Sequence, residues 1–271
     1  MKFALNFKYN NIINYRSLLM SLKEIIKNNI GPRRLIHLLA LKNYLLGEAE
    51  IKIIKYLVDS SKESIDVGAA NGIYTYFLSK ISSHVHSFEP NPLFYEFIKQ
   101  WAFDNVTVMP MALSDNRGIS TLSVPIIDNK EFNKEGSLEE TINGRHKKIK
   151  VSTITLDEIG YSNIGFIKID VEGHEDKVLE GSMKLLDKWR PNLLIEIEQR
   201  HHDNDIYETF SMIKDIGYEG YFLLKGRLTN IKEFLLKEHQ LKYLSNINSA
   251  SYINNFIFIA KRTVRFSKLF T

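Results

Sequence analysis

The sequence of 271 residues contains no cysteine. Disulfides, thiolate metal sites and cysteine nucleophiles are therefore excluded together. The chain also lacks any stretch near the roughly 20 consecutive apolar residues that a membrane-spanning helix needs. Asn and Arg interrupt residues 1–20, where a signal peptide would require an apolar segment. We therefore expect a cytoplasmic protein without a transmembrane segment.

A large excess of charge of one sign is also lacking. The 36 Lys and Arg residues are nearly balanced by 32 Asp and Glu residues, which gives a net charge of +4, and both signs are mixed along the chain. A small basic cluster at residues 261–268 is better explained as a solvated tail than as a nucleic-acid or membrane surface. We expect no nucleic-acid partner. The oligomeric state stays open, a homo-oligomer included.

Two regions differ in their pattern of apolar residues. Residues 11–59 show helical spacing, interrupted at Gly31-Pro32 and at Gly47. From Ser64 to Ala260, short apolar runs alternate with helical stretches, which is typical of a parallel sheet with crossover helices. We therefore expect a helical extension over residues 1–60, either a packed cap or a substrate lid, and an α/β domain over residues 61–271. Within this domain, residues 119–154 are expected to form two strands around a long loop.

The first chemical signal is a glycine-containing loop between an apolar strand and a helix. It comprises Asp66, Gly68, Ala69, Asn71, Gly72 and Tyr74. The glycines allow a tight turn close to a ligand, and the acid at the strand end can accept hydrogen bonds. A Gly-x-Gly fingerprint and a Gly-Lys-Ser/Thr element are both missing, which argues against a dinucleotide and against a phosphate-cradling loop. The loop favours a ligand without phosphates, such as S-adenosylmethionine, over a plain strand–helix turn.

The second signal is an acid at the end of the next predicted strand. Glu89, followed by Pro90 and Asn91, lies about 20 residues after the glycine loop, where an acid can accept hydrogen bonds from both ribose hydroxyls. An acid that serves a helix dipole is the plainer alternative. After the third predicted strand, Ala112 and Leu113 would leave room for an adenine ring, although this run alone also fits a surface turn.

The most specific run in the chain is residues 166–175, Phe-Ile-Lys-Ile-Asp-Val-Glu-Gly-His-Glu. Together with Thr155-Leu156-Asp157, Leu194-Ile195-Glu196 and the two signals above, it resembles the FkbM family of S-adenosylmethionine-dependent methyltransferases, over about residues 64–260. The resemblance implies a Rossmann-like class I methyltransferase fold: a seven-stranded, mostly parallel sheet with its last strand antiparallel and helices on both faces. One departure is Ala70, because the family more often has Asn there, whereas Asn71 falls one place later.

Candidate catalytic residues follow the strand at residues 166–169, because ligands bind at the carboxyl edge of open α/β sheets. Asp170 is expected beside the methyl donor, as part of the cofactor site and as a general base. It is also a candidate ligand of a divalent cation such as Mg²⁺. Glu172 and His174 on the following turn and Glu196 at the end of the next strand are further candidate bases. A helix-start residue and a surface acid are the alternatives for His174 and Glu196.

The adjacent His201 and His202 suggest a metal at first sight. Neighbouring side chains on extended backbone point apart, so a substrate-lining loop is favoured. Taken together, these residues and the resemblance predict an O-methyltransferase that uses S-adenosylmethionine and acts on a hydroxyl of a saccharide or glycan. The alternatives are an O-methyltransferase of a polyketide or peptide natural product and a non-catalytic nucleoside-binding scaffold. A nicotinamide-dependent oxidoreductase is disfavoured by the missing Gly-x-Gly.

Overall fold

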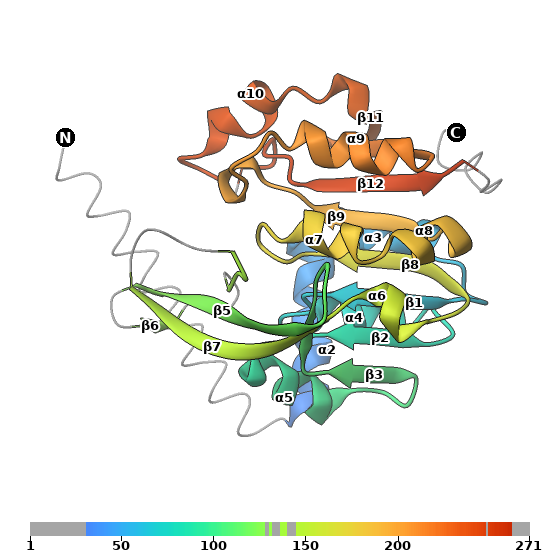
Figure 1. Cartoon of the computed structure of the whole chain (residues 1–271), viewed down its shortest axis with the longest axis vertical. Coiled ribbons are helices and arrows are strands. Elements are labelled where there is room, and N and C mark those ends of the chain that lie inside the picture. The colour runs from blue at the N-terminus through green and yellow to red at the C-terminus, as the bar shows by residue number, and fades with distance from the viewer. Residues whose placement is uncertain (1–30, 128–129, 132–135, 140–144, 248, 262–271) are drawn as a thin grey trace.

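The computed structural model describes residues 31–127, 130–131, 136–139, 145–247 and 249–261. Its main sheet has eight strands in the order β11-β10-β12-β9-β8-β1-β2-β3 (Figure 1). These strands are β1 (Glu63–Val67), β2 (Val85–Phe88), β3 (Val106–Met109), β8 (Ile164–Ile169), β9 (Asn192–Glu196), β10 (Tyr218–Leu224), β11 (Arg227–Asn230) and β12 (Asn255–Ala260).

The predicted sheet type is confirmed, but the predicted number of seven strands is wrong. Strands β1, β2, β3, β8 and β9 are mutually parallel, and β12 runs antiparallel between β9 and β10. Every residue of β12 is buried, as expected for a central strand. The eighth strand, β11, arises because Lys225 and Gly226 both have positive φ and form the two-residue turn of a hairpin.

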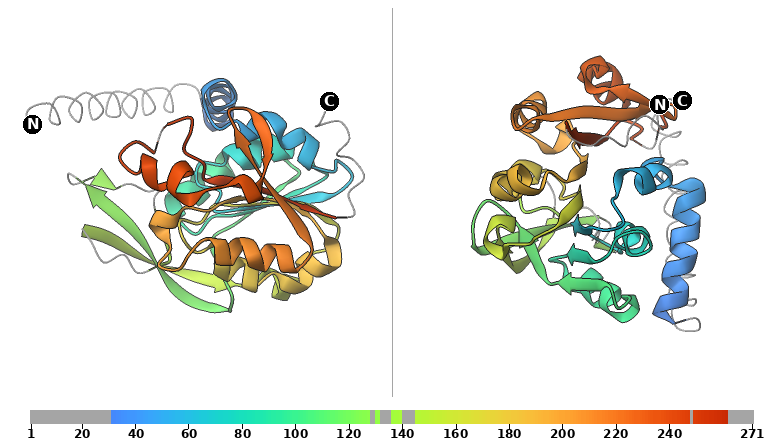
Figure 2. Two further views of the ribbon diagram at one scale, coloured as in Figure 1. Left: turned by 90° about the horizontal axis from the view of Figure 1, so that it is seen from above. Right: turned by 90° about the vertical axis from the view of Figure 1, so that its right-hand side faces the viewer.

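Helices cover both faces of the main sheet (Figure 2). On one face lie α2 (Pro32–Leu46), α3 (Glu50–Leu57), α4 (Ile73–Ser79) and α5 (Pro92–Trp101). On the other lie α6 (Leu156–Ile159), α7 (Glu175–Glu180), α8 (Met183–Trp189) and α9 (Tyr207–Asp215). The shorter helices η2 (Gln199–His201), η3 (Ile231–Glu233), α10 (Leu236–His239) and η4 (Leu241–Tyr243) follow β9 and β11.

The N-terminal helices that the structure describes pack onto the sheet domain. Helix α2 begins at Pro32 and ends before Gly47, as the sequence predicted. Ile36, Ile51 and Ile54 belong to the same buried cluster as residues of α4, α5 and the sheet, so these two helices share the core of the domain. The part of the predicted helical extension that precedes residue 31 lies outside the described residues. No helix among the described residues combines the length and apolarity needed to cross a bilayer.

A second sheet, of four strands, extends beyond the carboxyl edge of the first (Figure 1). It has the order β4 (Met111–Leu113), β7 (Arg145–Ile154), β5 (Gly118–Ile127) and β6 (Lys130–Glu131). Strands β5 and β7 form a long antiparallel pair, which confirms the two strands predicted within residues 119–154. Because β4 follows β3 after a single residue, this second sheet is fixed beside the edge where ligands bind in α/β folds.

Candidate active site

The loop from β1 to α4 turns sharply around three residues with positive φ. These are Gly68 (75°), Ala70 (48°) and Gly72 (76°). Gly68 packs against the backbone of Asp170 at the end of β8, and Gly72 packs against the Trp101 ring of α5, so neither position has space for a side chain. The glycines thus serve the close approach that the sequence predicted, although their immediate neighbours are protein groups.

Glu89 connects this loop to the end of β2. One of its carboxylate oxygens accepts a hydrogen bond from the Ala70 N–H over 2.6 Å, and the other accepts one from the Asn91 N–H over 2.7 Å. Burial raises the pKa of Glu89 to about 8, against the effect of these two hydrogen bonds. Each carboxylate oxygen can accept a second hydrogen bond, and Glu89 lies on the wall of a pocket.

That pocket lies at the carboxyl ends of β1, β2 and β8 and is narrow, about 50 Å³. Of the residues that the sequence predicted for the site, it brings together Gly68, Glu89, Pro90, Asn91, Ala112, Leu113, Asp170, Glu172 and His174. Sequence reasoning missed the other wall residues, Val67, Ala70, Phe88, Phe94, Met111, Leu122, Gly136, Leu138 and Val171. Among these, Phe94 follows Glu89 by five residues and could have been suspected as a ring beside the pocket.

The remaining predicted cofactor residues do not line this pocket. Ala69, Asn71, Gly72 and Tyr74 are absent from its wall. Asp66 is also absent, because its carboxylate accepts a hydrogen bond from the Thr75 hydroxyl of α4 over 2.5 Å and is fully buried there. Burial raises the pKa of Asp66 to about 6, with the Thr75 hydrogen bond acting against it. Asp66 therefore supports the loop from beneath, and the direct ligand contact predicted for it stays a prediction.

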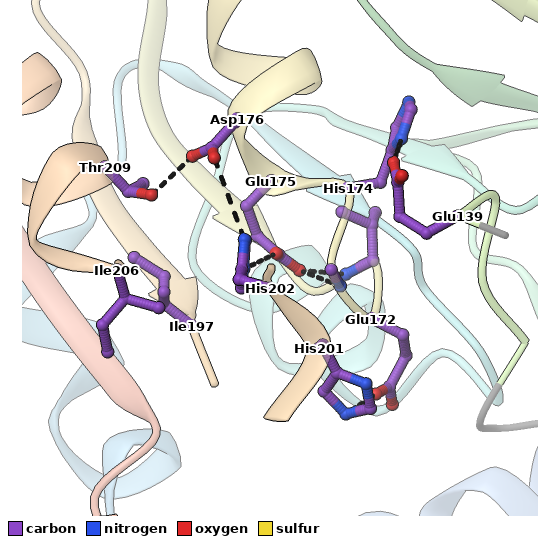
Figure 3. A network of polar contacts seen from close by, with 12 residues as sticks. Glu139, Glu172, His174, Glu175, Asp176, Ile197, His201, His202, Ile206 and Thr209 are labelled. Atoms are coloured by element: carbon purple, nitrogen blue, oxygen red, sulfur yellow. Dashed lines mark hydrogen bonds and ion pairs between the residues drawn. The ribbon is translucent and has the colours of Figure 1, made fainter. Parts of the chain in front are cut away.

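His174 links the turn after β8 to the second sheet. Its Nδ1 lies 2.5 Å from a carboxylate oxygen of Glu139, and its Nε2 lies 3.0 Å from the Ser114 hydroxyl (Figure 3). The Ser137 hydroxyl donates to the carbonyl of Glu172 in the same turn. Because both ring nitrogens of His174 already have partners, this arrangement favours a positioning role over that of a free base.

Beyond Asp170, a group of partly or fully buried acids continues along the carboxyl edge of the sheet. Asp170, Glu172, Glu196 and Glu198 all line a small cavity there. Burial raises the pKa of Glu172, and burial together with the nearby charge of Asp170 raises the pKa of Glu196 well above its usual range. Burial acts in the same direction on Glu198, but hydrogen bonds from Arg200 and Tyr252 lower its pKa to about 2. Glu196 therefore binds a proton more tightly than an ordinary glutamate does.

Lys168 compensates this negative charge from inside the sheet. Its ammonium group is fully buried, lies 3.7 Å from a carboxylate oxygen of Asp170, and donates to the Asn255 side chain over 3.4 Å. Burial disfavours the charged form, but the surrounding carboxylates, Asp170 first and Glu196 next, raise the pKa of Lys168. A buried cation at this place keeps acids close together that would otherwise repel one another.

The two adjacent histidines point apart, as the sequence predicted. His201 lies 3.0 Å from Glu172, whereas His202 lies 3.0 Å from Glu175 and 3.8 Å from Asp176 (Figure 3). His202 therefore fastens the η2 segment to the start of α7, which is a structural role.

Among the described residues, one group could hold a metal ion: Glu172, Glu198 and His201, whose ligand atoms lie within 4.8 Å of one another. Asp170, the metal ligand predicted from the sequence, is not part of this group. The Arg200 guanidinium already binds the Glu198 carboxylate with two hydrogen bonds, so a cation would have to compete with a charge in place. Mg²⁺ prefers oxygen ligands in octahedral geometry, which a site with one imidazole and an adjacent guanidinium does not offer.

Residues 66–219 match the domain described as Methyltransferase FkbM domain. The chain belongs to the FkbM methyltransferase family. This confirms the predicted family and the predicted enzyme class, an S-adenosylmethionine-dependent methyltransferase. The matched segment of this FkbM chain includes the glycine loop, Glu89, Asp170 and Glu196. No protein among the curated sequences matches the chain.

Similar solved structures include three methyltransferases. An FkbM methyltransferase from Methylobacillus flagellatus KT is 16% identical, with a TM-score of 0.49, over 92% of this chain and 60% of that chain. A SAM-dependent methyltransferase from Aquifex aeolicus is 12% identical, with a TM-score of 0.41, over 85% of this chain and 98% of that chain. An rRNA methylase from Streptococcus thermophilus is 14% identical, with a TM-score of 0.40, over 77% and 91%. The present chain therefore spans about three fifths of the length of the Methylobacillus protein.

Proposed function

We propose that this chain transfers a methyl group from S-adenosylmethionine to a hydroxyl oxygen. The observation that carries the proposal is Glu89. Its buried carboxylate holds the β1–α4 loop with one hydrogen bond to each oxygen and lies on the wall of the pocket. Free acceptor capacity on both oxygens suits two adjacent ribose hydroxyls. Ala112 and Leu113 supply the small and apolar wall that an adenine ring requires.

The residues beyond the pocket suit the acceptor side of the reaction. When bound, S-adenosylmethionine supplies the methyl group: the acceptor oxygen forms the new O–CH₃ bond, the S–CH₃ electron pair stays on sulfur, and the hydroxyl loses its proton. We assign Glu196 as the acceptor of that proton, because its raised pKa makes its ionised form a strong base. Asp170, which lines both the pocket and the acidic cavity, would orient the hydroxyl.

The acceptor that best suits this edge is a saccharide hydroxyl, since the groups beyond Asp170 are carboxylates and amides. An O-methyltransferase for a polyketide or peptide natural product would place a more apolar surface there. A scaffold without catalytic activity would not need Glu196 in its buried position. A Mg²⁺-assisted reaction remains the second mechanism to be tested. The Arg200–Glu198 pair argues against it, and we expect activity to survive an excess of EDTA.

Ligand binding requires the pocket to widen. Small-molecule sites usually enclose about 300–1,000 Å³, whereas this pocket encloses about 50 Å³. Part of its wall is formed by Leu122 of β5 and by Leu138, which belongs to the segment 136–139. This segment is held by hydrogen bonds of the Ser137 and Glu139 side chains and by two backbone hydrogen bonds between Ser137 and Ser123 of β5. The opposite wall is built from the strands of the main sheet. We therefore assign the widening to the segment 136–139.

Calorimetric titration with S-adenosylhomocysteine tests the cofactor assignment. We expect binding by the native chain and none of NAD. Glu89→Ala should weaken binding by on the order of 1–3 kcal/mol through the lost hydrogen bonds, whereas Glu96→Ala, at an exposed position on α5, should bind normally. Equal affinity in both variants would refute the assignment. Asp170→Asn should keep the fold and bind S-adenosylhomocysteine but lose most of its turnover.

A further inference from the structure

A second cavity, of about 570 Å³, opens on the same edge of the sheet. Three segments that are far apart in the sequence form it: the α2–α3 junction at residues 47–50, the β10–β11 turn, and the residues that precede β12. Its size falls within the usual range of small-molecule sites. None of the residues on its wall lines the narrow pocket assigned to the cofactor.

The wall of this cavity is rich in groups that form hydrogen bonds, and it includes side chains of both charge signs. Carboxylates of Glu48 and Glu50 lie on one side, the Lys225 side chain belongs to the hairpin turn, and Asn254 and Asn255 add two amides. Burial raises the pKa of Glu50 to about 7, so near neutral pH this carboxyl group both donates and accepts hydrogen bonds. Leu223 and Ile247 provide apolar patches beside these polar groups.

Side-chain contacts join this cavity to the acids of the candidate active site. The Asn254 amide, on the cavity wall, donates to the Glu196 carboxylate over 2.6 Å. The Tyr252 hydroxyl, on the same wall, donates to Glu198. Glu196 and Glu198 in turn line the small cavity that contains Asp170. A ligand that contacts Asn254 in the second cavity would therefore be separated from Glu196, the proposed proton acceptor, by the Asn254 side chain.

A second connection runs through the interior. The Lys168 ammonium group lies between Asp170 and the side-chain oxygen of Asn255. The amide of Asn255 lies 3.4 Å from the Glu48 carboxylate, which also accepts a hydrogen bond from Tyr74 over 2.5 Å. The buried lysine thus contacts one group on the wall of each cavity, Asp170 in the first and Asn255 in the second.

We propose that this second cavity binds the methyl acceptor, and that the acceptor is an uncharged, polyhydroxylated molecule of the saccharide type. The inference rests on the proposed function, because it needs a methyl donor in the narrow pocket. The chemistry follows from the wall: Glu48 and Lys225 carry opposite charges, so the wall as a whole favours neither sign of ligand charge. Carboxyl groups and amides together satisfy hydroxyl groups, which both donate and accept hydrogen bonds.

Saturation-transfer NMR with simple glycosides tests the inference, in the presence of S-adenosylhomocysteine. The probes are the methyl glycosides of glucose, galactose, mannose and rhamnose, with methyl glucuronide as the anionic counterpart. We expect saturation transfer to at least one neutral glycoside, and a signal at least fivefold weaker for the glucuronide. Ala250→Trp, which fills the cavity from an exposed part of its wall, should abolish the signal. Ser245→Trp, exposed and outside the wall, is the matched control and should retain it.

Calorimetry on the same samples distinguishes a failure of the acceptor assignment from a failure of the proposed function. If S-adenosylhomocysteine binds all three proteins equally and the neutral signal is lost only in Ala250→Trp, the acceptor assignment is supported. If S-adenosylhomocysteine binds but no neutral glycoside does, or Ala250→Trp keeps the signal, the acceptor assignment is refuted while the proposed function stands. A stronger signal for the glucuronide refutes the uncharged class. Absence of S-adenosylhomocysteine binding refutes the proposed function and the inference with it.

Discussion

Gly68 and Asp170 are in direct backbone contact: a Cβ atom on Gly68 would lie 1.8 Å from the carbonyl oxygen of Asp170. This contact joins the end of β1 to the end of β8. It brings the loop that Glu89 holds beside the acid that begins the active-site turn. The position of Asp170 relative to the cofactor pocket therefore depends on a residue without a side chain.

Gly68→Ala should be strongly destabilising. A methyl group there collides with backbone, which cannot rotate away, and Gly68 also has a φ of +75°. Steric overlap and the left-handed backbone conformation forced on the alanine should together lower the free energy of unfolding by about 2–4 kcal/mol. Gly160→Ala is the matched control, because Gly160 has a φ of +72° but nothing within 4 Å of the added atom. Urea denaturation of both variants separates collision from strain. An equal loss in the two would contradict the contact.

Ala70 explains the departure of the loop from the family pattern. It has a φ of +48°, a conformation that Asn adopts more readily than other residues with side chains. Asn would therefore fit the backbone of this position with less strain than Ala. Ala70→Asn should raise the free energy of unfolding by on the order of 1 kcal/mol, measured as a higher Tm. Asn71→Ala should leave the free energy of unfolding nearly unchanged. A larger effect at position 71 than at position 70 would mean that Asn71, one place later, takes the role assigned to position 70.

The residues around the β1–α4 loop show what could and could not be predicted from the sequence. Gly68, Glu89 and Asp170 were predictable as neighbours, because the carboxyl ends of parallel strands meet at one edge of a sheet. The contact of Asp66 with Thr75 was not predictable: Asp66 is the last but one residue of β1, and its side chain points toward α4. The sequence distance from a strand end does not fix that direction.

Other features depend on contacts between distant segments. Leu138 reaches the pocket only because β5 and β7 form a separate sheet beside it, which no local pattern around residue 138 indicates. The second cavity likewise combines residues 47–50 with residues near 225 and 250. Hydrophobic periodicity predicts elements well, but it does not specify which loops meet above a sheet.

Leu138→Ala should bind S-adenosylhomocysteine more tightly than the native chain. Leu138 forms part of the wall of a pocket that is too narrow for a nucleoside, so a smaller side chain should reduce the work of opening. A severalfold lower Kd by calorimetry is expected, whereas Ile119→Ala, on the exposed side of β5, should change nothing. Weaker binding by Leu138→Ala would show instead that this side chain contacts the bound nucleoside.

Stability should decrease from mildly acidic to mildly basic pH. Burial raises the pKa of Asp66 to about 6 and that of Glu50 to about 7, as it does for Glu89. Unfolded carboxyl groups titrate near pH 4, so between about pH 4 and 8 the folded state holds more protons than the unfolded state. The free energy of unfolding therefore falls as pH rises through this range.

Urea denaturation at pH 5, 6, 7 and 8 measures this slope. Glu50→Gln removes one of the buried acids and should flatten the curve between about pH 4.5 and 7. Glu208→Gln, at an exposed position of α9, should leave the slope as it is. A slope that does not change in Glu50→Gln would mean that this carboxyl group is solvated in the folded protein.

Glu196 is the residue on which the chemical proposal can be tested most directly. Its raised pKa means that the base form increases with pH well above the usual value of 4.5, so kcat should rise with pH along a limb that belongs to this group. Glu196→Gln should lower kcat by about 10²–10⁴-fold and remove that limb, while S-adenosylhomocysteine binding stays intact. Glu219→Gln, on the exposed side of β10, is the control.

Because the Lys168 charge lowers the pKa of Glu196, Lys168→Met should shift the limb to higher pH in any variant that still folds. A limb that persists in Glu196→Gln would assign the proton to another group, and Asp170 would be the next to test.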